Sequence, residues 1–189
     1  YIDSGTLTLT NSTVSGNTAY SGAGIYNYSG TLTLRNTIIA NSLNGFDCAI
    51  SQFATTTSLG HNLDGDGTCG LADATDKPNT DPMLAPLQDN GGPTLTHALL
   101  EGSPAIDAGD DSVLGDPLNL TTDQRGAGFS RLVDAHVDIG AFEFGATGPV
   151  TCNGLDATRW GTEDDDVLIG TSGPDVIVGL GGDDVIVGL

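Results

Sequence analysis

Residues 161–187 read GTEDDDVLI, GTSGPDVIV and GLGGDDVIV, three units of nine residues, and residues 188–189 open a fourth. In each unit a glycine-rich turn precedes an aspartate, and an apolar residue follows two positions later. Glycine permits the positive φ that tight turns need. One unit makes one turn and one short strand, so two units complete a coil and residues eighteen apart stack. This spacing predicts that Asp166 lies beside Asp184 and that Asp175 lies on the opposite edge.

The pattern resembles the calcium-binding RTX repeat, G-G-x-G-x-D-x-U-x, and the resemblance implies a parallel β-roll in residues 152–189. It also implies that carboxylates and turn carbonyls bind Ca²⁺, which prefers hard oxygen ligands. The implied ligand residues are Gly161, Glu163, Asp166, Gly170, Asp175, Gly179, Gly181 and Asp184. The second repeat position departs from the pattern, because Thr162, Thr171 and Leu180 replace glycine, and Asp164 occupies the fourth position of the first unit. A flexible Gly- and Asp-rich tail is the alternative, and the regular Asp-Val spacing argues against it.

A longer period runs through the N-terminal part of the chain. Residues 5–14 (GTLTLTNSTV) return as residues 30–39 (GTLTLRNTII), an offset of twenty-five residues. Short alternating strands joined by polar turns at this spacing are typical of a β-solenoid. Alternation places the leucines of both copies inside and stacks Asn11 over Asn36, which favours a structural role for these asparagines over glycosylation. We therefore predict an all-β fold: a right-handed parallel β-helix with an irregular C-terminal cap, followed by an RTX-type parallel β-roll.

The composition limits the partners of the chain. Twenty-five acidic residues face five basic ones, and the formal net charge is −20. A charge of this sign repels nucleic acid and anionic membranes and attracts divalent cations. No stretch reaches about 18 consecutive apolar residues, so no membrane span is expected. The sequence begins at Tyr1 in the middle of a repeat, so we expect a processed product or a piece of a longer protein.

The three cysteines, Cys48, Cys69 and Cys152, have no zinc-site spacing. We expect a Cys48–Cys69 disulfide that closes an irregular loop, with Cys152 free or paired outside the chain; a buried thiol pair is the alternative. Weak calcium sites of extracellular modules fill at about 0.1 to 1 mM Ca²⁺. Disulfide and calcium together predict an extracellular or cell-surface location.

Between about residues 46 and 85 the longer repeat fades into Gly, Asp, Thr and Asn. The densest run is Asp64-Gly-Asp66-Gly, which is either a second calcium loop or a solvated turn. It lacks the closing glutamate and the flanking helices of an EF-hand.

Five motifs follow this region: residues 81–84 (DPML), 89–100 (DNGGPTLTHALL), 102–109 (GSPAIDAG), 123–126 (DQRG) and 138–144 (DIGAFEF). In order and spacing they resemble the end of the β-helix in large bacterial surface proteins of the choice-of-anchor Q type, a resemblance that covers about residues 5–145. It implies a secreted β-helix that is capped before an anchoring module, and it implies no enzymatic activity.

Three parts are expected along the chain: β-helix coils and cap in residues 1–145, a linker in residues 146–151, and the incomplete β-roll in residues 152–189. We expect residues 102–109 to turn around a buried Ile106 and Trp160 to cover the first coil of the roll. Asp123 and Arg125 are expected to pair with each other or with Asp138 and to orient the cap.

No nucleophile elbow, H-E-x-x-H or P-loop motif is present, and none of the three histidines lies in a compact motif with Arg or Lys. The sequence favours a secreted or cell-surface structural or adhesive β-solenoid. Calcium ions are its expected partners, together with self-assembly through exposed strand edges.

Two other functions are consistent with parts of the sequence. Alginate-epimerase-like proteins also join a β-helix to RTX repeats, so the alternative is a fragment of a polysaccharide-modifying enzyme, epimerase- or lyase-like, whose catalytic site lies upstream. Ice binding through threonine rows is a third hypothesis, and two coils form too small an array to favour it.

Overall fold

The computed structural model describes all 189 residues, which divide into two compact units, Tyr1–Ala146 and Thr147–Leu189. Both units are built from short strands. The helical element is a single 3₁₀ turn, η1 (Asp111–Leu114), and no helix is long and apolar enough to cross a membrane. The strands of the first unit are β1 (Thr6–Thr10), β2 (Thr13–Ser15), β3 (Ile25–Asn27), β4 (Thr31–Arg35), β5 (Ile38–Ala40), β6 (Cys48–Ile50), β7 (Thr55–Ser58), β8 (Leu63–Asp64) and β9 (Lys77–Pro78).

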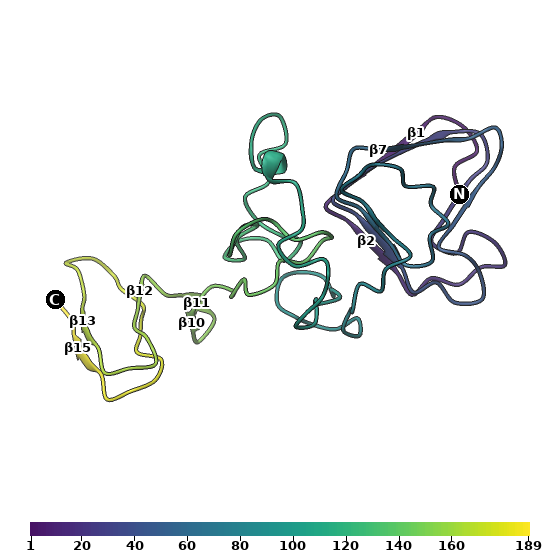
Figure 1. Cartoon of the computed structure of the whole chain (residues 1–189). Coiled ribbons are helices and arrows are strands. Elements are labelled where there is room, and N and C mark those ends of the chain that lie inside the picture. Colours follow the sequence, from purple (N-terminus) through teal and green to yellow (C-terminus); the bar gives the residue numbers. More distant parts are fainter. The chain divides into compact units, whose positions relative to one another are not determined.

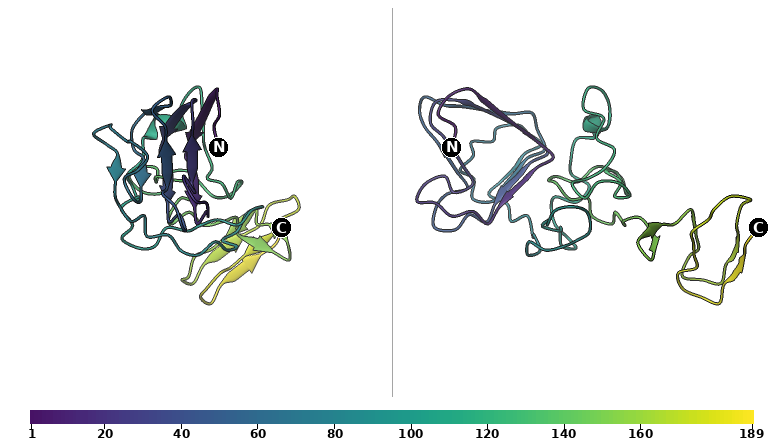
Figure 2. Two further views of the ribbon diagram at one scale, coloured as in Figure 1. Left: turned by 90° about the vertical axis from the view of Figure 1, so that its right-hand side faces the viewer. Right: turned by 180° about the vertical axis from the view of Figure 1, so that it is seen from behind.

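The first unit begins as a parallel β-helix. Its strands form three sheets, in the orders β1-β4-β7, β2-β5-β8-β9 and β3-β6, and every pairing is parallel. Thr6 pairs with Thr31 and Thr13 with Ile38, which is the offset of twenty-five residues read from the sequence. The coils appear nearly end-on in Figure 1, as roughly triangular loops, and their strands lie side by side in the left view of Figure 2.

Alternation along the strands fills the interior of the helix. Leu32 and Leu34 of β4 are fully buried, and Ile39 of β5 meets them from the neighbouring sheet. The disulfide between Cys48 and Cys69 joins this cluster, with its two Cα atoms 4.8 Å apart. The interior is therefore apolar and cross-linked.

The coils continue where the sequence repeat fades. Strand β6 of the second coil pairs in parallel with β3 of the first, and β7 and β8 of the third coil pair in parallel with β4 and β5 of the second. In β7 the inward positions carry Thr56 and Ser58, which pair with Leu32 and Leu34. Ser58 Oγ donates to Asp76 Oδ1 at 2.9 Å. The repeat fades from the sequence here although the strands continue, because hydroxyl side chains replace the leucines that made the repeat visible.

A left-handed residue turns the chain between the first and second sheets in each coil. Asn11 (φ 45°) and Asn36 (φ 47°) occupy this corner in the first two coils, and His61 (φ 56°) follows in the third. Asparagine tolerates this conformation better than most residues do. His61 is held there because its Nδ1 lies 2.8 Å from the carbonyl oxygen of Ala108.

Residues 81–146 form an irregular segment that packs against the outer face of the second sheet. Ile38 and Ala40 of β5 point outward and are fully buried beneath Ile139 and Phe142 of this segment. Gly140 makes the close approach: its φ is +103°, and a Cβ there would lie 2.8 Å from the Cδ1 atom of Ile38. Its N–H donates to the carbonyl of Asn36 at 2.8 Å. The glycine of the 138–144 motif thus docks the segment.

The 102–109 run turns as expected around an apolar residue, but that residue is Ala105 rather than Ile106. Ala105 is fully buried, whereas Ile106 is half-buried. Ser103 Oγ fixes the turn by donating to the carbonyl of Pro82 at 2.6 Å. The tight turn leaves space inside only for a methyl group.

The second unit contains a hairpin and a two-sheet roll. Its strands are β10 (Thr151–Cys152), β11 (Leu155–Asp156), β12 (Arg159–Trp160), β13 (Val167–Ile169), β14 (Ile177–Val178) and β15 (Val185–Val187). Strands β10 and β11 are antiparallel around Asn153 and Gly154, both with positive φ, as in a type I′ turn. Strands β12 and β14 pair in parallel, as do β13 and β15, each eighteen residues apart. Cys152 is exposed and outside any disulfide.

The core of the roll is thin. Leu168 and Ile177 are half-buried, while Ile186 is 52% exposed. Trp160 is 58% exposed and lines a shallow hollow of about 300 Å³ with Leu168, so it covers the first coil only in part. Burial of apolar surface therefore contributes little to the stability of this unit.

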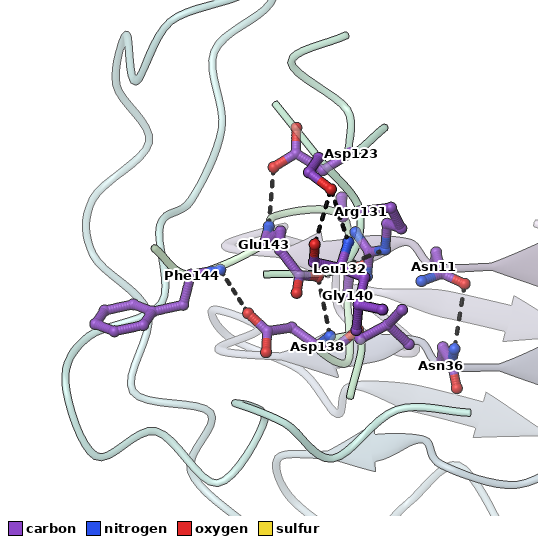
Figure 3. Close-up of polar contacts among 12 residues, drawn as sticks. Asn11, Asn36, Asp123, Arg131, Leu132, Asp138, Gly140, Glu143 and Phe144 are labelled. Carbon is purple, nitrogen blue, oxygen red and sulfur yellow. Dashed lines mark hydrogen bonds and ion pairs between the residues drawn. The ribbon is translucent and has the colours of Figure 1, made fainter. Parts of the chain in front are cut away.

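The irregular segment of the first unit buries a group of charged side chains, shown in Figure 3. Arg125 Nη2 lies 2.6 Å from Asp123 Oδ2, and the guanidinium is sandwiched between Phe129 and Phe142 at 4.1 and 3.8 Å from the ring centroids. Asp138 accepts hydrogen bonds from the backbone N–H groups of Asp107 and Phe144 instead of pairing with Arg125. Asp123 and Arg125 thus pair with each other.

Arg131 connects this group to the β-helix. It is 1% exposed and donates to the carbonyls of Asp138 and Gly140 at 2.6 and 2.8 Å. The Asn11 amide accepts from Asn36 at 3.3 Å in one orientation; turned over, its oxygen lies 2.9 and 2.6 Å from Nε and Nη2 of Arg131. The second orientation is favoured, because charge-assisted hydrogen bonds are shorter and stronger.

Glu143 is a buried acid whose charge partner lies outside hydrogen-bond distance. Its carboxylate lies 3.8 Å from Arg131 Nε, too far for a hydrogen bond, and accepts from the N–H of Asp138 at 3.0 Å. Burial outweighs the attraction of Arg131 and raises the pKa of Glu143 to about 8, from an ordinary value of 4.5. Glu143 therefore carries a proton at neutral pH.

This proton makes the stability of the first unit depend on pH. Between about pH 4.5 and pH 8 the folded state holds a proton that the unfolded state has lost, so the free energy of unfolding falls as the pH rises. Asp64, with a pKa raised by burial to about 6, acts in the same direction below that pH. We expect Glu143→Gln to reduce the slope between about pH 6 and pH 8 by up to about 1.4 kcal/mol per pH unit.

Urea unfolding followed by near-UV circular dichroism of tyrosine measures this slope, because all four tyrosines lie in residues 1–28. Glu101→Gln, at an exposed glutamate, is the matched control and keeps the wild-type slope. Equal slopes in wild type and Glu143→Gln would mean that Glu143 is already ionised at pH 6.

Candidate metal site

Two turns of the roll stack on one edge and bring two aspartates together. Register between β13 and β15 places residues 161–166 beside residues 179–184. The N–H of Asp166 donates to Asp184 Oδ1 at 3.0 Å, and the N–H of Val185 donates to the carbonyl of Asp166 at 2.8 Å. Both aspartates are half-buried. The structure therefore places Asp166 and Asp184 side by side.

Threonine at the second repeat position holds the aspartate of its own turn. Asp166 Oδ2 accepts hydrogen bonds from the N–H and the hydroxyl of Thr162, at 2.6 and 2.8 Å. Thr171 makes the same two bonds to Asp175 Oδ2, at 2.5 and 3.0 Å. These threonines were read from the sequence as departures from the repeat pattern, and their role was missed. The four-residue spacing from threonine to aspartate, repeated in two units, was the available signal.

Glycines bring backbone and carboxylates close together on this edge. A Cβ at Gly161 would lie 2.5 Å from the carbonyl oxygen of Gly179 and 2.7 Å from Asp166 Oδ2. A Cβ at Gly179 would overlap Asp184 Oδ2, and one at Gly181 would lie 2.5 Å from Glu163 Oε2. The carboxylates thus occupy the space that side chains would fill.

The charge of this edge is unbalanced. Six acidic residues lie in the two stacked turns: Glu163, Asp164, Asp165, Asp166, Asp183 and Asp184. Residues 147–189 contain one basic residue, Arg159, which lies outside these turns. Clustered carboxylates and turn carbonyls are the hard oxygen donors that divalent cations such as Ca²⁺ prefer. The residues present therefore fit a calcium ion.

The two remaining residues of the predicted site lie elsewhere. Gly170 and Asp175 belong to the turn on the opposite edge of the roll, with Gly170 buried against Asp175. The pKa of Asp175 is lowered, mainly by the hydrogen bond from the backbone N–H of Thr171. The hydroxyl groups of Thr171 and Thr158 and the charge of Arg159 lower it further. Six of the eight predicted residues thus gather on one edge and two on the other.

The comparison with protein families agrees with this arrangement. Residues 160–189 match the family model described as RTX calcium-binding nonapeptide repeat (4 copies). Residues 160–189 are RTX repeats. The ion that they bind is calcium. No curated protein and no solved structure matches the chain.

A second acidic cluster lies in the first unit, outside the RTX repeats. Carboxylate oxygens of Asp47, Asp64 and Asp66 all lie within 4.8 Å of one another, and Asp47 and Asp64 are buried. Asp64 accepts from the N–H groups of Cys69 and Gly67, at 2.7 and 3.1 Å. Asp66 accepts from the N–H of Asp47 at 2.9 Å. These carboxylates shape the loop that carries the disulfide. Of the two aspartates in the 64–67 run, Asp66 is exposed, as a solvated turn residue would be, whereas Asp64 is buried.

The glycine spacing of the RTX repeats can be tested with two variants at the same repeat position. Gly179→Ala places a methyl group against the carboxylate of Asp184, whereas Gly188→Ala meets nothing within 4 Å. We expect Gly179→Ala to raise the calcium concentration at half-maximal folding by about tenfold, which corresponds to about 1.4 kcal/mol. Gly188→Ala keeps the wild-type midpoint. Trp160 fluorescence during calcium titration measures the midpoint of each variant. Equal midpoints would show that calcium binding does not require a glycine beside the carboxylate of Asp184.

Proposed function

We propose that the protein is a secreted or cell-surface structural or adhesive β-solenoid whose RTX repeats fold when they bind calcium. The observation that carries the proposal is the stacking of Asp166 and Asp184 within two acidic turns that contain no basic residue. Like charges gathered in stacked turns repel each other, and a bound cation would offset that repulsion. Gly161, Glu163, Gly179 and Gly181 would complete the ligand set around such an ion.

The second unit has little else to hold it together. Val185 and Ile186 are 54% and 52% exposed, and eight acidic residues face one arginine between residues 147 and 189. When a site does not exist in the unfolded chain, the free energy of metal binding becomes free energy of folding. Calcium would supply the attraction that the thin core lacks.

The first unit supports an extracellular location. Its interior contains a buried disulfide, and disulfides persist in oxidising compartments. Calcium is abundant outside cells and scarce inside them, so the repeats would stay unfolded before export and fold afterwards. The β-helix, with its own apolar core, would fold without the ion.

Separate aromatic probes test the calcium dependence of each unit in the full chain. Trp160, the single tryptophan, reports on the roll, and the four tyrosines report on the β-helix. After chelation, Ca²⁺ is expected to change Trp160 fluorescence and leave the tyrosine near-UV signal constant.

The double variant Asp166→Asn/Asp184→Asn is expected to abolish the tryptophan response, whereas Asp156→Asn, outside the repeats, retains it. A Trp160 signal that is insensitive to calcium in the wild type would refute calcium-coupled folding.

We also propose self-association through β1, which is the edge of its sheet. The N–H of Thr31 donates to Gly5 and the N–H of Asn11 to Arg35. In this parallel pattern the N–H groups of Thr6, Thr8 and Thr10 point away from β4. Unpaired strand edges recruit other strands.

Sedimentation velocity at rising protein concentration tests this edge. We expect wild type to associate and Thr8→Pro to remain monomeric, because proline removes an outward N–H without touching the β4 ladder. Thr8→Lys keeps that N–H and should weaken association by adding charge to the edge. Tyrosine circular dichroism controls for folding. Association that persists in both folded variants would exclude β1 as the interface.

A further inference from the structure

The aspartate carboxylates on the two edges of the roll have different neighbours. On the Asp175 edge both carboxylate oxygens are engaged by protein groups: Oδ1 accepts from the hydroxyl of Thr158 at 3.0 Å, and Oδ2 accepts from Thr171. On the other edge, Asp166 Oδ2 accepts from Thr162 in the same way, and the stacked turn contributes a second carboxylate, Asp184, whose Oδ1 accepts from the N–H of Asp166. The hydroxyl group of Thr158 therefore lies beside Asp175, whereas the carboxylate of Asp184 lies beside Asp166.

Strand register explains the difference. Arg159 pairs with Ile177 in β12 and β14, which sets Ala157 level with Asp175 and Thr158 level with Val176. Ala157 stands where a stacked repeat would carry an aspartate, and it offers no side-chain oxygen. The adjacent residue, Thr158, reaches across to Asp175 instead.

Thr158 also joins the two strands through their backbones. Its N–H donates to the carbonyl of Val176 at 2.9 Å, and its hydroxyl oxygen accepts from the N–H of Val176 at 3.0 Å. The hydrogen bonds between these two strands are thus satisfied by the protein alone.

We propose that Thr158 closes the Asp175 edge toward the preceding turn without calcium, so that residues 158–178 form a metal-independent half-coil. Calcium then completes the opposite edge, between Asp166 and Asp184. The inference rests on the proposed calcium-coupled folding of the RTX repeats. A half-coil that is already paired reduces the chain entropy lost when the calcium site closes.

Amide hydrogen exchange of the full chain in excess chelator, and again in excess Ca²⁺, tests the inference. The N–H of Val176 reports on the Thr158 edge, and the N–H of Val185, which donates to Asp166, reports on the calcium edge. In chelator we expect Val176 to exchange at least about tenfold more slowly, relative to its unfolded rate, than Val185. In calcium both are protected.

Two matched threonine variants sharpen the test. Thr158→Val keeps the shape of the side chain and removes its hydroxyl, so it should abolish protection of Val176 in chelator. Thr162→Val removes the corresponding hydroxyl beside Asp166 and should leave that protection unchanged, while raising the calcium midpoint.

Each outcome decides one claim. If Val176 is unprotected in chelator, or if Thr158→Val leaves its protection intact, the metal-independent edge is wrong. If Val185 is equally protected with and without calcium, the proposed calcium-coupled folding fails instead, and the Thr158 edge is still judged by Val176 alone.

Discussion

Parallel stacking in register is the constraint on which both units depend. It places each residue over its equivalent one coil later, so that Leu34 lies over Leu9 and Asn36 over Asn11. Stacked leucines build a core. Stacked carboxylates repel each other. The same rule therefore stabilises the β-helix and gathers acidic side chains in the RTX turns, with Asp184 beside Asp166.

The two units compensate their acidic groups by different means because their basic residues are unevenly distributed. Four of the five lie in the first unit, where Arg125 pairs with Asp123 between two phenylalanine rings. Elsewhere in that unit backbone N–H groups bind the carboxylate of Asp138, and burial keeps a proton on Glu143. The second unit has only Arg159 for eight acidic residues, so the protein itself supplies little positive charge there.

Hydroxyl groups are as important as carboxylates in the architecture of the roll. Thr162 and Thr171 donate hydrogen bonds to the aspartates of their own turns, which fixes the orientation of each carboxylate in the folded roll. Thr158 extends the same chemistry across a strand pair. A repeat that departs from glycine at its second position thereby gains an internal hydrogen-bond donor.

The sequence by itself determined the features that repeat. Periods of nine and twenty-five residues predicted parallel coils, the stacking of Asp166 on Asp184 and the corner asparagines, because stacking translates regular spacing directly into proximity. Only the tertiary structure decided the features that do not repeat. The third coil carries Thr56 and Ser58 where leucines had been, and the irregular segment docks through Gly140 onto a face that no period marks. Thr158 lies just before the matched repeats, and the register of β12 and β14 brings it into contact with Asp175. Such contacts depend on shape and on hydrogen bonds between distant residues, and neither leaves a periodic trace in the chain.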